Sequence, residues 1–100
     1  MLWAISCVDR ADTAALREAR MRPHREYFDQ QKSILVLCGP TLTDDGSAAT
    51  GSLFIINVAR RADAEAFSAN DPFPCAGTFE RVVITRMRKS QWNPTAAENA

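Results

Sequence analysis

Two side chains in this chain of 100 residues could together move a proton. His24 is the only histidine, and Asp71 stands directly before Pro72. Proline disfavours the helical conformation of the residue before it, so we expect a helix to end at Asp71 and its carboxylate to occupy a fixed corner. Because free imidazole has a pKa of about 6.5, a histidine oriented by this carboxylate could act as a general base.

In the expected mechanism, neutral His24 takes a proton from a substrate hydroxyl or carbon. Asp71 holds the ring in one tautomer and stabilises the imidazolium that forms. The alternative is that His24, like most single helical histidines, is a surface or core group without chemistry. Asp9, at the end of the first predicted strand, is a second candidate acid or a ligand for a substrate hydroxyl, with an Asx turn or helix cap as the alternative.

Five further residues are candidates for binding a substrate. Ser52 opens a predicted strand and could donate a hydrogen bond, although serine is also common at strand starts. Gly39 and Pro40 are expected to shape the backbone and leave the pocket accessible. Tyr27 and Phe73 either fill the core or line a slot for a planar ring.

Composition removes several classes of function. Twelve basic and twelve acidic residues give no net charge, which argues against nucleic acid as a partner. No apolar run approaches the roughly 18 residues of a membrane span, and no signal-peptide core is recognised, so we expect a cytoplasmic protein. The three cysteines, at positions 7, 38 and 75, form no C-x-x-C pair and are expected to be small hydrophobes. Neither a metal nor a nucleotide motif is present, so no cofactor is expected.

The hydrophobic pattern predicts the elements that must position these residues. Residues 2–8 alternate as a strand, and an amphipathic helix follows from Ala14 to about Gln31. The inner face of this helix is predicted to carry Leu16, Ala19, Tyr27 and Gln31, with Arg17, Glu18, Arg25 and Glu26 outside. Pro23 is expected to kink or restart the helix just before His24.

The second half of the pattern continues with a strand over 34–38 that Gly39 and Pro40 end in a turn, and a polar loop over 41–50. Residues 51–59 are apolar on both faces, as expected of a central strand. A short helix over 61–69, a last strand over 79–88 and a loosely docked tail from Ser90 follow. This order predicts a ferredoxin-like βαββαβ fold of class α+β, with a four-stranded antiparallel sheet and helices on one face. Residues 1–89 form the domain and 90–100 the tail.

The predicted sheet has one face without helices, and this face is expected to contact another protein chain. The third and fourth strands place apolar residues on both sides, and a monomer rarely leaves such a patch exposed. We therefore expect a homodimer that packs sheet face against sheet face.

The residues at the joints between these elements resemble those of the YciI-like (YCII-related) family of small α+β barrel proteins. The resemblance covers nearly the whole chain and depends on the order and spacing of short motifs. These are Cys7-Val8-Asp9, the helical segment 22–27, Cys38-Gly39-Pro40, Gly51-Ser52, and Asn70-Asp71-Pro72-Phe73 with Ala76-Gly77.

The resemblance implies a dimeric α+β barrel with a pocket where the helix histidine meets the Asp-Pro aspartate. One activity described in the family is elimination of HCl from a chlorinated hydroxyquinol in aromatic degradation. A cofactor-independent lyase or isomerase acting on a small oxygenated ring is therefore the leading hypothesis. The alternatives are a small-molecule binding module and an accessory subunit of a catabolic pathway. The arginine that relatives often carry three positions before the histidine falls on Met21, between Arg20 and Arg22.

Overall fold

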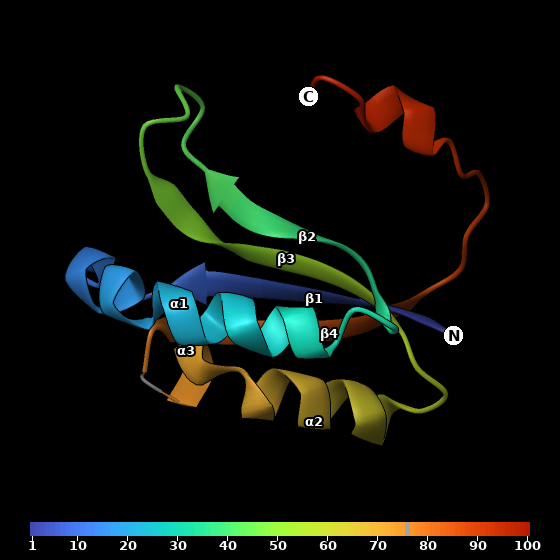
Figure 1. The fold of residues 1–100 in the computed structure, drawn as a ribbon, viewed down its shortest axis with the longest axis horizontal. Coiled ribbons are helices and arrows are strands. Elements are labelled where there is room, and N and C mark those ends of the chain that lie inside the picture. The colour runs from blue at the N-terminus through green and yellow to red at the C-terminus, as the bar shows by residue number, and fades with distance from the viewer. Residues whose placement is uncertain (76) are drawn as a thin grey trace.

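The chain folds as a four-stranded antiparallel sheet with its α-helices on one face (Figure 1). The computed structural model describes residues 1–75 and 77–100, without the side chains of Pro74 and Cys75. Ala76, which belongs to one of the sequence motifs, and the side chain of Cys75, which was expected to be a small hydrophobe, therefore lie outside the described residues. The elements in chain order are β1 (Leu2–Asp9), α1 (Ala14–Gln30), β2 (Leu35–Leu42), β3 (Ala49–Asn57), α2 (Arg61–Asn70), α3 (Pro72–Cys75), β4 (Phe79–Met87) and the 3₁₀ helix η1 (Pro94–Ala97).

The strand order β2-β3-β1-β4 confirms the predicted ferredoxin-like α+β fold, with β3 inside the sheet as expected. Alternation along β1 places Trp3, Ile5 and Cys7 on the helix-covered face, where all three are buried. Ile5 pairs with Phe54 on one side and with Ile84 on the other. The core therefore lies between the central strands and the helix layer.

The prediction that a turn at Gly39 and Pro40 ends the second strand was wrong. β2 continues through both residues, with Gly39 paired to Leu53 and Pro40 to Ser52. Because β2 is an edge strand, one side of its backbone needs no ladder hydrogen bond, and a proline without an N–H is tolerated there.

The expected restart of the helix at Pro23 was also wrong, since α1 is one continuous helix from Ala14 to Gln30. An internal proline costs about 3 kcal/mol or more through its missing hydrogen bond and its clash with the preceding turn. The contacts of α1 on both sides of Pro23 offset this cost. Arg17 bonds the sheet before it, and His24 bonds the end of α2 after it.

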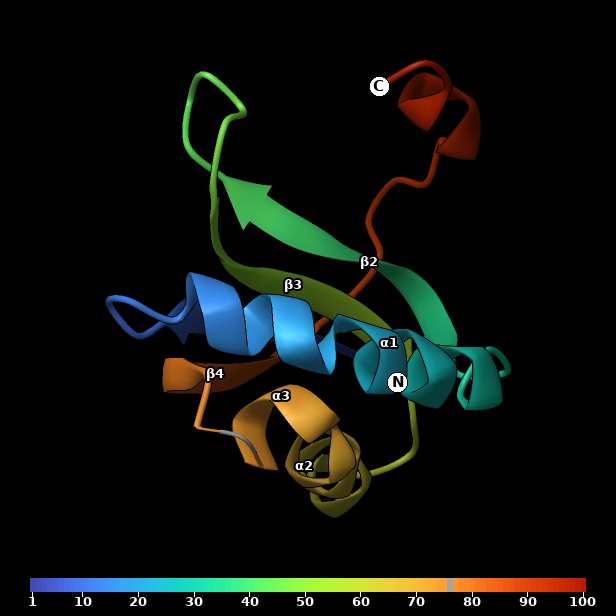
Figure 2. The same cartoon turned by 60° about the vertical axis from the view of Figure 1, so that its left-hand side comes forward.

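The sheet face away from the helices is apolar and open. Exposed apolar side chains on all four strands gather there: Val8, Leu37, Leu53, Val83 and Met87. The tail after β4 rises on this side, away from the helix layer, and carries η1 at its end (Figure 2). Within the described residues, no helix has both the length and the apolar character needed to cross a membrane.

Candidate active site

The structure brings His24 and Asp71 together across 47 residues of sequence. Nδ1 of His24 lies 2.6 Å from Oδ1 of Asp71, and the two residues are 6% and 2% exposed. A carboxylate can only accept a hydrogen bond, so we assign the proton to Nδ1. Nε2 then carries the lone pair, and it has no hydrogen-bond partner among the residues that the structure describes. This is the tautomer that a general base needs.

Asp71 takes its position from the chain path at Pro72. α2 ends at Asn70, and Asp71 adopts an extended conformation (φ −68°, ψ 130°), as expected for a residue before proline. The same Oδ1 atom also accepts a hydrogen bond from the N–H of Phe73 at 3.2 Å. The sequence had predicted that this corner leads directly into the last strand. It leads instead into the short helix α3.

Aromatic rings fix the orientation of the imidazole. The ring of Phe73 stacks on His24 at a centroid distance of 3.6 Å and an angle of 13°, and Phe28 meets its edge at 4.1 Å. Phe73 is fully buried, so it holds the histidine ring rather than lining an open slot. The imidazole can therefore rotate little about its side-chain bonds.

Arg17 is the functional candidate that the sequence interpretation placed on the wrong side of α1. It is only 8% exposed, and its NH2 donates hydrogen bonds to the carbonyl oxygen of Gly51 at 2.7 Å and to Oγ of Ser52 at 3.0 Å. Positions 17, 21, 24 and 28 follow helical spacing, so a stripe drawn through His24 would have placed Arg17 inside. Ala19, predicted to face inward, is exposed.

Gly51 is the one position where the strands require glycine. A Cβ built there would lie 1.9 Å from the carbonyl oxygen of Cys7, and the Gly51 carbonyl anchors Arg17. We predict that Gly51→Ala lowers the free energy of unfolding by about 1–3 kcal/mol, because β3 must shift away from β1. Chemical denaturation measures this loss, with Gly39→Ala as the control because a Cβ at that position meets open space. Equal stability of the two variants would contradict the prediction.

Asp9 forms an ion pair with Arg17 and is not part of the His24–Asp71 pair. Its Oδ1 lies 3.6 Å from NH1 of Arg17, and Ser52 reaches the same guanidinium from β3. Burial raises the pKa of the Asp9 carboxyl above its ordinary value, while the positive charge of Arg17 opposes that rise. Asp9, Arg17 and Ser52 therefore form a second polar cluster beside the His24–Asp71 pair.

Cys7 lies close to both clusters without the chemistry of a nucleophile. Burial raises the pKa of its thiol to about 12, with the negative charges of Asp71 and Asp9 adding to the effect. Only the thiolate attacks, so this group is inactive near neutral pH.

The remaining predicted binding residues donate no side-chain hydrogen bond to either cluster within the described part of the chain, although Pro40 pairs with Ser52 in the sheet. Tyr27 donates its hydroxyl hydrogen to the carbonyl oxygen of Phe67 at 2.8 Å and so ties α1 to α2. Gly39 and Pro40 lie within the edge strand, and neither lines either cavity described below.

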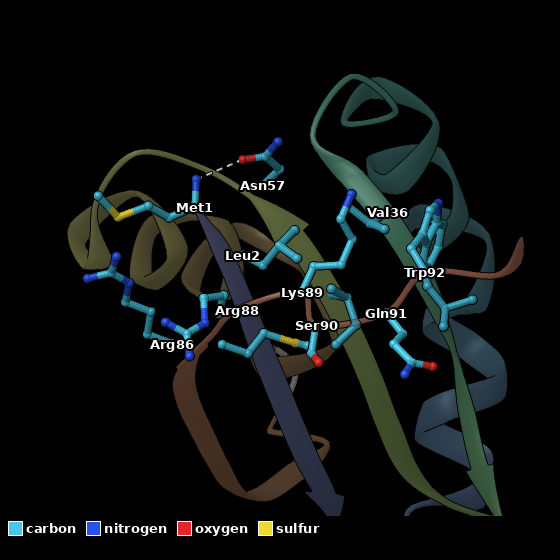
Figure 3. A pocket seen from close by; sticks show the side chains of 13 residues that line it. Met1, Leu2, Val36, Asn57, Arg86, Arg88, Lys89, Ser90, Gln91 and Trp92 are labelled. Carbon is cyan, nitrogen blue, oxygen red and sulfur yellow. Dashed lines mark hydrogen bonds between the residues drawn. The ribbon is translucent and has the colours of Figure 1, made fainter.

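Among the residues that the structure describes, a larger and a smaller cavity stand out, and neither of these is lined by His24 or Asp71. One is a groove of about 1090 Å³ between the open sheet face and the tail, where Leu2, Lys89 and Trp92 face one another (Figure 3). The other, of about 630 Å³, lies at the start of α1 and is lined by Asp9, Arg17 and Met21 among others. The expectation that the pair itself opens into a pocket is not met by these two cavities. The smaller cavity reaches Met21, which lies one helical turn before His24.

Comparison with known families matches residues 1–88 to the YCII-related domain. The chain belongs to the YCII-related domain family. Its fold is similar to the structure of a 5-chloro-2-hydroxyhydroquinone dehydrochlorinase (TftG) from Burkholderia phenoliruptrix AC1100 in complex with 2,5-dihydroxybenzoquinone. The TM-score is 0.81 at 29% sequence identity, and the match covers 88% of this YCII-related chain and 94% of the other. No curated protein matches the sequence.

Proposed function

We propose that this protein is a cofactor-independent lyase that removes HCl from a chlorinated, hydroxylated aromatic ring. The observation that carries the proposal is the buried hydrogen bond between His24 and Asp71, which leaves Nε2 of the imidazole free to take a proton. Similarity to a dehydrochlorinase supports this choice of reaction and of 5-chloro-2-hydroxyhydroquinone as the first substrate to test.

In the proposed reaction, Nε2 of His24 takes the proton of a ring hydroxyl, and the resulting phenolate pushes electron density into the ring. The carbon that bears chlorine gains a proton, and the carbon–chlorine bond then breaks with its electron pair leaving on chloride. Loss of a second hydroxyl proton gives 2-hydroxy-1,4-benzoquinone. One HCl is released, and the ring is oxidised as the carbon–chlorine bond is reduced, so the balance needs no external oxidant.

Asp71 acts through His24 in this proposal. Its carboxylate holds the Nδ1–H tautomer and stabilises the imidazolium formed after proton transfer. Phe73 stacks on one face of the His24 ring and so limits rotation of the imidazole away from Asp71.

Access to His24 is proposed to run through the cavity at the start of α1. Met21 lines that cavity and lies three residues before His24 on the same side of the helix. A methionine side chain is unbranched and adapts its shape, so it can move aside for a planar ring more easily than an aromatic or β-branched residue.

The direct test is to incubate the protein with 5-chloro-2-hydroxyhydroquinone under argon and measure chloride release together with formation of the quinone. Stoichiometric chloride and quinone above the rate without protein are the expected result. Chloride release at the background rate, with folded protein at substrate saturation, would reject the proposed function.

A binding module is the second candidate, because the pair lies outside both cavities and is almost fully buried. A module of this kind returns its ligand unchanged. Product analysis after one turnover, with protein in excess over ring compound, distinguishes the two: unchanged compound recovered from a saturated complex favours the module.

We also propose that a second copy of the chain covers the open sheet face. The five exposed apolar side chains there form a patch that a two-fold axis can pack against itself. The tail supports this occupant, because η1 is exposed throughout and Trp92 stays 57% exposed although it lines the groove beside the sheet.

We expect light scattering after size exclusion to give about twice the 11.1 kDa mass of the chain at micromolar concentration. Leu37→Asp, which places a charge in the apolar face, should yield the monomer, whereas Ala62→Asp on the exposed side of α2 should not. A monomeric wild type at that concentration would end this proposal.

A further inference from the structure

The groove between the open sheet face and the tail has an apolar floor. Leu2, Leu37, Ile55 and Met87 line it, and the antiparallel register places all four on the face without helices. Its volume of about 1090 Å³ is close to the upper end of the roughly 300–1,000 Å³ that small-molecule sites occupy. The groove is therefore large enough for a compound with a ring or a chain.

The same groove has a cationic rim, formed by Arg86, Arg88 and Lys89. Its described lining contains no Asp or Glu. The rim belongs to an acid-free stretch of the chain, since residues 81–97 contain four basic residues and no Asp or Glu. Positive charge is therefore concentrated here, although the chain as a whole has no net charge.

The bases of the rim are not neutralised by the protein. Within residues 1–75 and 77–100, none of the three forms an ion pair. On the helices, by contrast, Arg22 pairs with Glu26 and Arg61 with Glu65, one turn away in each case. An exposed cation is well solvated and needs no partner, but three of them around one apolar floor favour an anion in the groove.

The charged and aromatic groups lie at different ends of the groove. Figure 3 shows Arg86 and Arg88 toward one end and Trp92 toward the other, with Lys89 between them. Arg86 belongs to β4, and the lining also includes Val36 of β2, so the groove extends between the two edges of the sheet. Trp92 is 57% exposed and offers a flat apolar surface. The groove is therefore amphipathic along its length.

The second copy proposed above leaves this end of the sheet face free. Three of the five apolar residues assigned to that contact, Val8, Leu53 and Val83, do not line the groove. Leu53 and Val83 both pair with Ser6, toward the end of β1 opposite to Leu2. A two-fold contact centred near Ser6 leaves the groove open to a small molecule.

We infer that this groove binds an amphipathic anion, a small molecule with an apolar body and one carboxylate or phosphate group. The rim holds the anionic group, because guanidinium and ammonium groups donate charge-assisted hydrogen bonds to such oxygens. The floor and Trp92 cover the apolar body. This site is independent of the proposed dehydrochlorination, since its lining includes neither His24 nor Asp71.

The probes are 2-naphthoate, 2-naphthyl phosphate and the neutral 2-naphthamide, which share one ring system. In a titration followed by ¹H–¹⁵N NMR, the anions should shift the indole N–H signal of Trp92. The signal of Trp3 should stay in place, because Trp3 is 6% exposed and donates its indole hydrogen to the carbonyl of Val58.

At least one anion should bind at least about tenfold more tightly than the amide, since the amide lacks the charge. Acetate, which has the charge without the rings, should leave the Trp92 signal unchanged at the same concentration. Equal affinity of the anions and the amide, or no shift of Trp92 up to the solubility of 2-naphthoate, would overturn the inference. In a dimeric protein, the second result assigns the groove to the second copy.

The double variant Arg86→Gln/Arg88→Gln tests the rim, with Arg20→Gln/Arg25→Gln on the exposed side of α1 as the matched control. Both variants remove two positive charges from exposed positions, so they change the net charge equally and keep the fold. Affinity for the tighter anion should fall at least about tenfold in the first and change less than about twofold in the control. An equal loss in both variants, or an unchanged affinity in the first, would contradict a site at the rim.

Discussion

Replacing His24 with glutamine is expected to lower the rate of dehydrochlorination of 5-chloro-2-hydroxyhydroquinone by about 10²–10⁴-fold, the usual contribution of a positioned general base. Glutamine fills much of the same space and can still donate a hydrogen bond to Asp71, but it offers no basic nitrogen at the position of Nε2. Chloride release at substrate saturation measures the loss in kcat. Little activity should remain, because the proposed reaction uses no base other than Nε2 of His24.

Arg25→Gln is the matched control for this experiment. Arg25 is the next residue on α1 and is exposed. Its substitution introduces the same glutamine side chain at a site outside both polar clusters. Its activity should equal that of the wild type. A rate in His24→Gln within threefold of the wild type, with dispersed NMR signals that show a folded protein, would remove the histidine from the mechanism.

Asp71→Asn is expected to reduce kcat by about 10²–10⁴-fold while the fold is kept, because the amide can orient its NH₂ group toward Nδ1. The proton then moves to Nε2, and the ring presents a donor where the base should be. Oδ1 of Asp71 also accepts a hydrogen bond from the N–H of Phe73 in the wild type, and an amide NH₂ group at that position leaves this N–H without its acceptor.

Ring ¹⁵N shifts of His24 distinguish this role from a merely structural one. They should report Nδ1–H in the wild type and Nε2–H in Asp71→Asn, whereas Asp63→Asn on α2, away from the pair, should leave both the tautomer and the rate unchanged. Full activity in Asp71→Asn, or loss of activity without a change of tautomer, would contradict a positioning role for this carboxylate.

The order of elements could be predicted from the sequence because the strands and helices carry the patterns that local physics requires. β1 alternates between a buried and an open face, and α2 stops where Pro72 forces Asp71 out of the helical conformation. β3 is apolar on both sides and occupies an interior position in the sheet. These features depend on residues close together in the chain.

The errors occurred where packing overrides a local preference. Pro23 does not interrupt α1, because contacts with the sheet and with the residue that follows α2 hold the two halves of the helix. Pro40 does not end β2, because an edge strand leaves one side of its backbone free. In each case the proline still lacks its N–H, but the surrounding structure keeps the helix or the strand intact.

Arg17 shows the same limit at the candidate site. A charged residue on an amphipathic helix is normally placed in water, since burial of an unpaired charge is unfavourable. The partners that make its burial possible are the Gly51 carbonyl and Ser52 on β3, which are distant in sequence, and Asp9 at the end of β1. Only folding reveals them.

The amino-acid sequence by itself determined the succession of elements, the extended corner at Asp71 and the presence of a single imidazole. Tertiary structure alone decided that His24 and Asp71 lie 2.6 Å apart in a nearly closed core, and that Asp9 pairs with Arg17 beside an accessible cavity. The reason is physical: backbone preferences act over a few residues, whereas both distances depend on how α1 packs against the sheet and against the end of α2.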